Sequence, residues 1–269
     1  MKRVVVIADL HCGHRVGLTP PGYQEGQRTL RDKHDHKTKF LNRCAASQKE
    51  CWTAYKAIMA DLQPIHLLIV NGDAIDGRGE KSGGTELITG DRDEQCSMAV
   101  ESIMLAKAKH IAMCYGTAYH AGQEEDWEDQ IARRVKADKI GSHEWPSVNG
   151  LIFDVKHFVG SSSIPHGRAT AVKREALWNT IWAEARKQPQ ARVIVRSHVH
   201  YFEFNGNVRQ LCMTTPALQA MGTKFGARKC SGIVDWGVTY FDVDKDGYYK
   251  HEWCCPPDLT CQVAKEDKY

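Results

Sequence analysis

The sequence predicts an α/β protein in which a first sheet is joined by a second, β-rich section. Short apolar runs typical of buried strands alternate with helical segments through the first half of the chain. The second half is mostly β. Polar residues suited to metal ligation or acid–base chemistry follow several of the strand candidates. These three observations together indicate a sheet with helices on its faces and an added second sheet.

The chain opens with a buried strand. The β-branched run over residues 3–9 predicts it, and a long polar excursion with Gly and Pro near its start follows over residues 13–40. Apolar residues at helical spacing over 47–63 predict a helix that stops before Pro64. A second apolar run over 65–70 predicts the next buried strand.

The same alternation continues. Residues 77–94 form a glycine-rich loop, and residues 95–109 are predicted as a helix. A third strand is expected over 110–115. The segment 124–137 has acidic residues first and basic residues last, which suits the helix dipole and predicts a helix.

The second half begins with alternating residues over 151–160, which predict a strand. A helix is expected over 168–188, ended by Pro189, and another strand over 191–200. The remainder is predicted to be mostly β, with turns at 205–207 and 244–247.

Composition narrows the function classes. A net charge of +3 over 269 residues does not by itself argue for nucleic acid. No apolar run approaches the roughly 18 residues that span a bilayer, so no membrane association is expected. The ten cysteines favour free thiols in a reducing, cytoplasmic compartment. Because Cys254, Cys255 and Cys261 lack a paired C-x-x-C spacing, they are weak candidates for structural zinc. The chain is expected to be a single domain over 1–269, with insertions at about 13–40 and 77–94.

Polar residues gather where the predicted strands end. Asp9 and His11 follow the first strand, and Asp73 and Asp76 the second. The remaining pairs are Thr117 with His120, and His198 with His200. Because the carboxyl ends of strands converge on the ligand crevice of open α/β sheets, we expect these side chains to meet.

Two similar patterns are given ordinary explanations. Asp32, Lys33 and His34 repeat the D-x-H spacing, but no strand positions them, so a solvated loop is favoured. The segment DVDKDG over 242–247 imitates a calcium loop, but Trp253 stands where its last carboxylate should be. A β-hairpin turn is expected there instead.

The order of the motifs resembles that of the calcineurin-like metallophosphoesterases, especially uncharacterised bacterial and phage members. That family has D-x-H, G-D-x-x-D, G-N-H-[DE], a single histidine and G-H-x-H. This sequence has DLH at 9–11, GDAID at 72–76 and SHVH at 197–200, and it departs at the third motif with GTAYH over 116–120. The resemblance implies a four-layer αββα sandwich.

The resemblance also implies a ligand set for two divalent transition metal ions, Mn, Fe, Zn, Ni or Co. Asp9, His11 and His200 would hold the first ion. His157 and His198 would hold the second, with Asp73 bridging and Thr117 or His120 completing it. His166 is the alternative to His157, which is preferred because a strand orients ligands better. Asp76 would support a ligand, and Arg168 and His14 are candidates for contacting the substrate phosphate.

The implied activity is phosphoester hydrolysis, in which a metal-bridging hydroxide attacks phosphorus and His120 protonates the leaving group. The sequence itself does not distinguish monoesters from diesters, and the resemblance favours a phosphodiesterase acting on nucleotides or nucleic acid. The alternative is a catalytically impaired binding or scaffold protein that keeps the fold, because the third motif is altered. The oligomeric state is not legible from the sequence.

Overall fold

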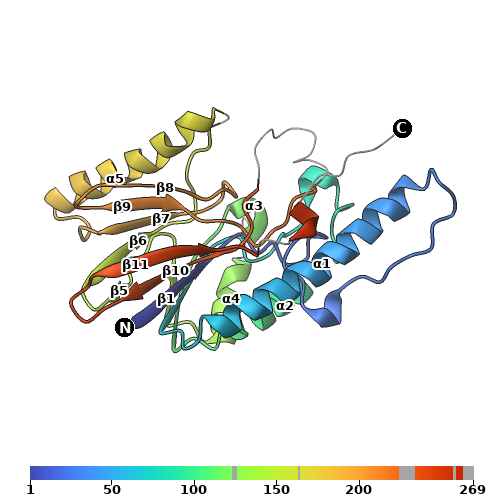
Figure 1. The fold of residues 1–269 in the computed structure, drawn as a ribbon, viewed down its shortest axis with the longest axis horizontal. Helices are drawn as coiled ribbons and strands as arrows, with labels where there is room; N and C mark the ends of the chain where they lie inside the picture. Colours follow the sequence, from blue (N-terminus) through green and yellow to red (C-terminus); the bar gives the residue numbers. More distant parts are fainter. Residues whose placement is uncertain (123–125, 163, 224–233, 257–258, 263–269) are drawn as a thin grey trace.

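The computed structural model describes residues 1–122, 126–162, 164–223, 234–256 and 259–262, and two sheets form its centre (Figure 1). The first sheet has six strands in the order β11 (Tyr249–Cys254), β10 (Val238–Val243), β1 (Lys2–Ile7), β2 (Leu67–Asn71), β3 (His110–Cys114) and β4 (Lys139–Gly141). The second has five strands in the order β5 (Ser147–Val148), β6 (Leu151–Val155), β7 (Val193–Arg196), β9 (Leu211–Thr214) and β8 (Glu203–Gly206). The strands from β1 to β4 run parallel, as do β6, β7 and β9.

Helices cover the outer faces of both sheets. The outer face of the six-stranded sheet carries α1 (His36–Asp61), α2 (Arg92–Met104) and α4 (Trp127–Val135), and that of the five-stranded sheet carries α5 (Arg168–Glu184). One turn of helix, α3 (Ala118–Ala121), follows β3. Short 3-10 turns lie at Pro21–Tyr23, Glu80–Ser82, Pro165–Gly167 and Thr260–Gln262.

Burial explains why β1 is apolar on both of its faces. Val5 and Ile7 pack into the core beneath α1, α2 and α4. Val4 and Val6 face the other way, into a core shared with Phe153 and other residues of the second sheet. Because neither face meets water, the strand is a continuous apolar run. The two-sheet, four-layer arrangement predicted for this chain is confirmed.

Several helix and strand boundaries differ from the expectation. The helix expected over 47–63 begins eleven residues earlier, because the Asp35 carboxylate caps it by accepting the Thr38 N–H at 3.1 Å. The first turn, residues 36–39, is polar and mostly exposed, so apolar spacing does not mark the start of the helix. The strands expected over 151–160 and 191–200 are shorter, because their polar carboxyl ends leave the sheet. Two residues of the helix expected over 124–137, 124 and 125, lie outside the described residues.

The ordinary explanations of the two similar patterns hold. Asp32, Lys33 and His34 are exposed in the loop before α1. Residues 244–247 form the turn between β10 and β11, where Asp244 accepts the N–H groups of Asp246 and Tyr248. No described helix is both long enough and apolar enough to cross a membrane.

Candidate metal centre

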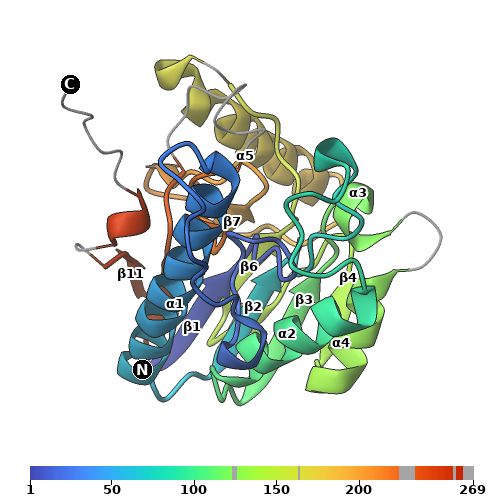
Figure 2. The same ribbon diagram turned by 90° about the vertical axis from the view of Figure 1, so that its right-hand side faces the viewer.

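The carboxyl ends of β1, β2, β3, β6 and β7 converge on one edge of the molecule, which faces the viewer in Figure 2. Parallel backbone hydrogen bonds fix the first two exits together. The Asp9 N–H donates to the Gly72 carbonyl at 3.1 Å, and the His11 N–H donates to the Asp73 carbonyl at 3.0 Å. The polar residues that follow these strands are thereby held side by side.

The backbone at this edge is strained. Asp9, His11, Asp73, His198 and His200 all have positive φ, between 44° and 72°. Left-handed conformations are uncommon for residues other than glycine, and they cluster at functional sites.

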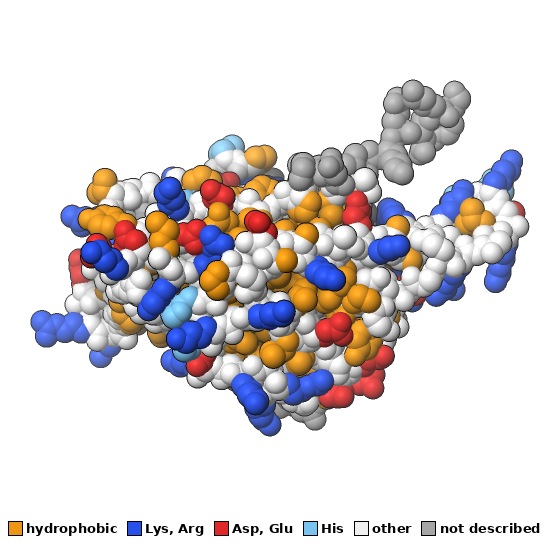
Figure 3. Space-filling model, turned by 60° about the horizontal axis from the view of Figure 1, so that its bottom comes forward, with side chains coloured by type: hydrophobic (Ala, Val, Ile, Leu, Met, Phe, Trp, Pro, Cys, Tyr) orange, Lys and Arg blue, Asp and Glu red, His pale blue; other side chains and the backbone are white. Residues whose placement is uncertain are grey.

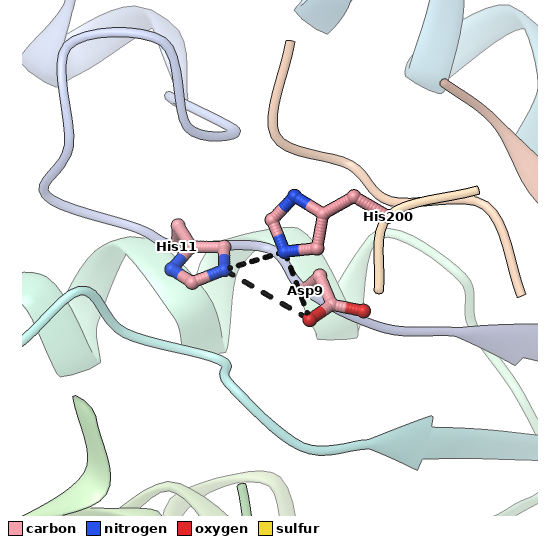
Figure 4. Close-up of side chains that lie close together, drawn as sticks. All are labelled: Asp9, His11 and His200. Atoms are coloured by element: carbon pink, nitrogen blue, oxygen red, sulfur yellow. Dashed lines mark hydrogen bonds and ion pairs between the residues drawn. The ribbon is translucent and has the colours of Figure 1, made fainter. Parts of the chain in front are cut away.

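Three side chains from β1 and β7 form a first cluster (Figure 4). The Asp9 Oδ1 lies 3.2 Å from the His200 Nε2 and 3.9 Å from the His11 Nε2. The two histidine Nε2 atoms lie 3.2 Å apart. Asp9 and His11 are buried, whereas the His200 side chain is 19% exposed, so the cluster opens on the β7 side.

A second cluster lies beside the first. The Asp73 Oδ2 lies 3.0 Å from the His157 Nε2 and 3.9 Å from the His198 Nδ1. The Asp9 Oδ1 also lies 3.9 Å from the His157 Nε2, so Asp9 links the two clusters. The six residues expected to hold metal lie in two groups, but the contact between the groups is made by Asp9 and not by Asp73, which was expected to bridge them. A third group of possible ligands joins His11 with Asp76 and His120.

The donor atoms of both clusters suit cations. The Asp9 Oδ1 and the His157 Nε2 are buried and have no hydrogen-bond partner, although burial without one is costly. The 3.0 Å contact between His157 and Asp73 lacks hydrogen-bond geometry, so it leaves the His157 Nε2 unsatisfied. Ligand atoms about 2.1 Å from a tetrahedral metal lie about 3.4 Å from one another, near the separations in the first cluster. The residues present fit divalent metal ions.

Hydrogen bonds at Nδ1 fix the ring orientation of two of the candidate ligand histidines. His157 Nδ1 donates to the Asn71 carbonyl at 2.6 Å, and His11 Nδ1 lies 3.1 Å from the Asp76 Oδ1. With Nδ1 engaged in this way, each ring turns its Nε2 toward the cluster, which is how metal-binding histidines are held. The Asp76 carboxylate therefore lies beside the ring of His11, a candidate ligand.

The altered third motif folds into a helical turn. Because α3 begins directly after Thr117, His120 returns toward the site despite standing two residues late. Its ring centroid lies 4.5 Å from that of His11, and its Nδ1 donates to the Asp76 carbonyl at 2.8 Å. Thr117 instead bonds Asp73, whose Oδ1 accepts the threonine N–H at 2.7 Å and its hydroxyl at 3.1 Å.

The remaining candidates lie around the clusters. His14 is buried, and its Nδ1 accepts the Val16 N–H, so the structure does not place it on the surface. Arg168 begins α5 and its guanidinium lies 4.4 Å from the ring centre of Tyr201, the residue after His200. His166 is exposed in a 3-10 turn and belongs to no described group of candidate ligands. Cys254, Cys255 and Cys261 form no such group among the described residues either.

Two supporting residues were missed by the sequence analysis. Glu128 of α4 is fully buried, and its two oxygens accept the N–H groups of Ala74 and Gly116, joining the second and third motif loops. Asn71 donates to the Ser197 hydroxyl at 2.7 Å. Ser197 also bonds the Thr215 hydroxyl at 2.7 Å, so the serine that departs from the family's glycine is satisfied. Neither residue belongs to a spacing motif that could have revealed it.

Burial and neighbouring charges shift the pKa values of several residues in the site. Burial raises the pKa of Asp73, but the neighbouring His157 outweighs it and holds the pKa well below its usual range. Burial lowers the pKa of His157, but Asp73 and Asp9 raise it to about 10. Burial and the nearby His11 lower the pKa of His120. Burial raises the pKa of Glu128 to about 7.

A buried ionic network lies behind the site, between β6, β7 and α5. The Arg196 guanidinium contacts the Asp154 Oδ1 at 2.8 Å and donates to the Glu175 Oε2 at 3.0 Å. Asn179 donates to the other Asp154 oxygen at 2.7 Å, and His143 lies 2.8 Å from Asp154. Burial raises the pKa of Asp154, but His143 and Arg196 outweigh it and lower the pKa to about 2. The network pins the strands that carry His157 and His198.

Comparison with known proteins gives similarity in structure only. No family model and no curated protein matches the sequence. Among solved structures, the chain is similar to an archaeal phosphodiesterase at 12% identity, covering 94% of this chain and 99% of that chain, with a TM-score of 0.42. It is similar to a predicted phosphoesterase from Streptococcus pneumoniae TIGR4 at 11% identity, covering 94% and 88%, with a TM-score of 0.41. It is also similar to zinc-complexed Vps29 from Entamoeba histolytica at 12% identity, covering 94% and 98%, with a TM-score of 0.41.

At TM-scores below 0.5, these likenesses say nothing about the chemistry of this chain's own site. The fold is therefore assigned from the layers and strand order of this chain itself. Two sheets packed between helices, with polar clusters at the strand ends, are what the resemblance to the calcineurin-like metallophosphoesterases implies. That prediction is confirmed for the fold.

Proposed function

We propose that this chain is a dinuclear metal-dependent phosphoesterase that hydrolyses phosphodiesters. One observation carries the proposal. Two adjoining sets of carboxylate and imidazole ligands are linked by the Asp9 Oδ1, and that atom and the His157 Nε2 are buried without hydrogen-bond partners.

The donor set favours particular ions. Imidazole with carboxylate oxygen suits Mn, Fe, Zn, Ni or Co, because no thiolate takes part. Asp9, His11 and His200 would hold one ion, and Asp73, His157 and His198 the other. When bound, such ions supply Lewis acidity and lower the pKa of water beside them.

The chain's own residues orient the reaction. Asp76 and the Asn71 carbonyl fix the rings of His11 and His157. The side chains of His198 and His200 are 35% and 19% exposed, so a substrate phosphate would enter from their side. His120 donates to the Asp76 carbonyl through Nδ1, so its imidazolium form is the one that carries a second proton, on Nε2, for the leaving oxygen. A nucleotide or nucleic acid in the cytoplasm, where the cysteines stay reduced, is the proposed substrate.

The test is metal-dependent hydrolysis. The protein should be stripped with a chelator, reloaded separately with Mn, Fe, Zn, Ni or Co, and assayed on bis-p-nitrophenyl phosphate and p-nitrophenyl phosphate. We expect the diester to be hydrolysed and Asp73→Asn to lose activity and bound metal. Elemental analysis showing no bound metal, together with no hydrolysis, would refute the proposal.

A binding or scaffold role is the second candidate, and Thr117 favours it. Its hydroxyl and N–H contact Asp73, so the third motif supplies no amide ligand to the second cluster. Metal bound at both clusters with no hydrolysis of either ester would support this role.

A further inference from the structure

The segment before and within the start of α1 projects from the body beyond the site (Figures 1 and 3). We call residues 28–43 the basic arm. It carries six exposed cationic side chains: Arg28, Arg31, Lys33, Lys37, Lys39 and Arg43. Figure 3 shows Lys and Arg side chains gathered on this projection.

The positive charge of the arm is only partly offset by its neighbours, of which Glu25 pairs with Arg28 at 3.1 Å. The arm contains two acidic residues, and both bind backbone N–H groups. The Asp32 carboxylate accepts the His34 N–H at 2.6 Å, and the Asp35 carboxylate accepts the N–H groups of Arg31 and Thr38. Since the whole chain carries only +3, the arm holds more net positive charge than the entire protein.

The base of the arm adjoins the first cluster. The Arg43 guanidinium donates to the Gly222 carbonyl at 3.1 Å. Three residues earlier, the Gln219 N–H donates to the carbonyl of Asp9 at 2.9 Å. With a helix rise of about 1.5 Å per residue, Asp35 lies about 12 Å beyond Arg43.

An exposed aromatic ring lies beside the second cluster. Phe158 is 55% exposed, and its ring centroid lies 4.9 Å from that of His198 in the second cluster. Exposed aromatic rings of this kind stack nucleobases, whereas a cationic surface contacts phosphates regardless of sequence.

We infer that the site takes a nucleic-acid strand, with one base stacked on Phe158 and the phosphates beyond the clusters held by the basic arm. The inference rests on the proposed function, because a chain linked by phosphodiesters presents the scissile group and the distant phosphates together. A mononucleotide presents no such series of phosphates. An anionic membrane would account for the arm but not for Phe158 beside the site.

The test is binding of labelled DNA by the full chain in excess EDTA, so it does not depend on activity. Fluorescence anisotropy on a 20-nucleotide single strand, at several salt concentrations, compares wild type with an Arg31→Ala, Lys33→Ala, Lys37→Ala variant. Its matched control replaces three exposed lysines at the opposite edge of the sheet, as Lys2→Ala, Lys109→Ala, Lys245→Ala. Loss of three phosphate contacts should make the negative slope of log binding constant against log salt concentration shallower by about 2. The affinity should be at least about tenfold weaker at 0.1 M salt. The control should bind within about twofold of wild type.

Phe158→Ala should weaken single-strand binding by about fivefold or more. Phe204→Ala, which removes a ring of similar exposure from β8, should leave it unchanged. Circular-dichroism melts verify folding, and the single variant Lys37→Ala repeats the arm test with less change. Wild-type affinity in the arm variants, or arm-dependent binding to phosphatidylserine vesicles without DNA binding, would overturn the inference. Failure of metal-dependent hydrolysis would instead count against the proposed function, because DNA binding in EDTA is measured independently.

Discussion

Asp76→Asn should weaken one metal site and spare the other. The Asp76 carboxylate is buried and lies 3.1 Å from His11 Nδ1, so it both orients the ring and increases the basicity of Nε2. Asparagine keeps the shape and an acceptor oxygen but removes the charge. Loss of such a partner costs about 10- to 100-fold in metal affinity, or about 1.4–2.7 kcal/mol at 1.36 kcal/mol per tenfold change.

The second cluster is an internal control for this prediction. The His157 ring is held by the Asn71 carbonyl, which the substitution does not touch. Titration of the metal-free protein with Zn²⁺ against a chelating indicator should therefore show one weakened and one unchanged class of site. Asp91→Asn, made at the exposed cap of α2, should bind as wild type does. Equal weakening of both classes, or none, would refute the assignment of Asp76 to His11.

Three further predictions follow from the site and its supports. His120→Ala should slow hydrolysis of an alkyl phosphodiester about 10²- to 10⁴-fold. Hydrolysis of a p-nitrophenyl ester should slow far less, because nitrophenolate leaves without a proton. Equal losses of steady-state rate for the two esters would contradict the proton-donor role. Glu128→Gln should lower the free energy of unfolding by about 1–3 kcal/mol, because an amide has one acceptor oxygen for the N–H groups of Ala74 and Gly116. Urea denaturation measures this change, and an unchanged midpoint would contradict the prediction. The folded pKa of Asp154 is lowered from 3.8 to about 2, so its contribution to the free energy of unfolding, on the order of 2 kcal/mol, is present above pH 4 and lost as pH falls toward 2. Urea denaturation across this pH range should therefore show a smaller loss of stability for Asp154→Asn than for wild type. Parallel stability curves for the two proteins would refute this prediction.

The layers of the fold were legible in the sequence because the core is patterned. Strands buried on both faces, such as β1, are unbroken apolar runs, and α4 carries its acidic and basic residues at the ends that suit its dipole. The first half of α1 was not legible. Its first turn is polar, so the Asp35 cap is the main local signal for its start, whereas Leu41, Cys44 and Ala45 further along are buried at helical spacing.

The candidate site was predictable to the extent that its ligands stand next to strands. Asp9 and His200 are far apart in sequence and follow strands of different sheets, so the convergence of strand ends and the order of the motifs were what indicated that they would meet. The position of His120 was not predictable, since it depends on whether the residues after Thr117 form a helical turn. Glu128 was hidden for a different reason: its role comes from a helix packed against two loops, and no spacing records that contact.

The left-handed backbone at the candidate ligands restricts which side chains those positions can hold. Aspartate, asparagine and histidine tolerate positive φ better than most residues, whereas β-branched residues do not. Those tolerant residues include the very types that bind transition metals. Conformation and coordination therefore select the same residues at Asp9, His11, Asp73, His198 and His200. A redesign of the centre for another metal must therefore use residues that tolerate positive φ as well as residues that the metal prefers.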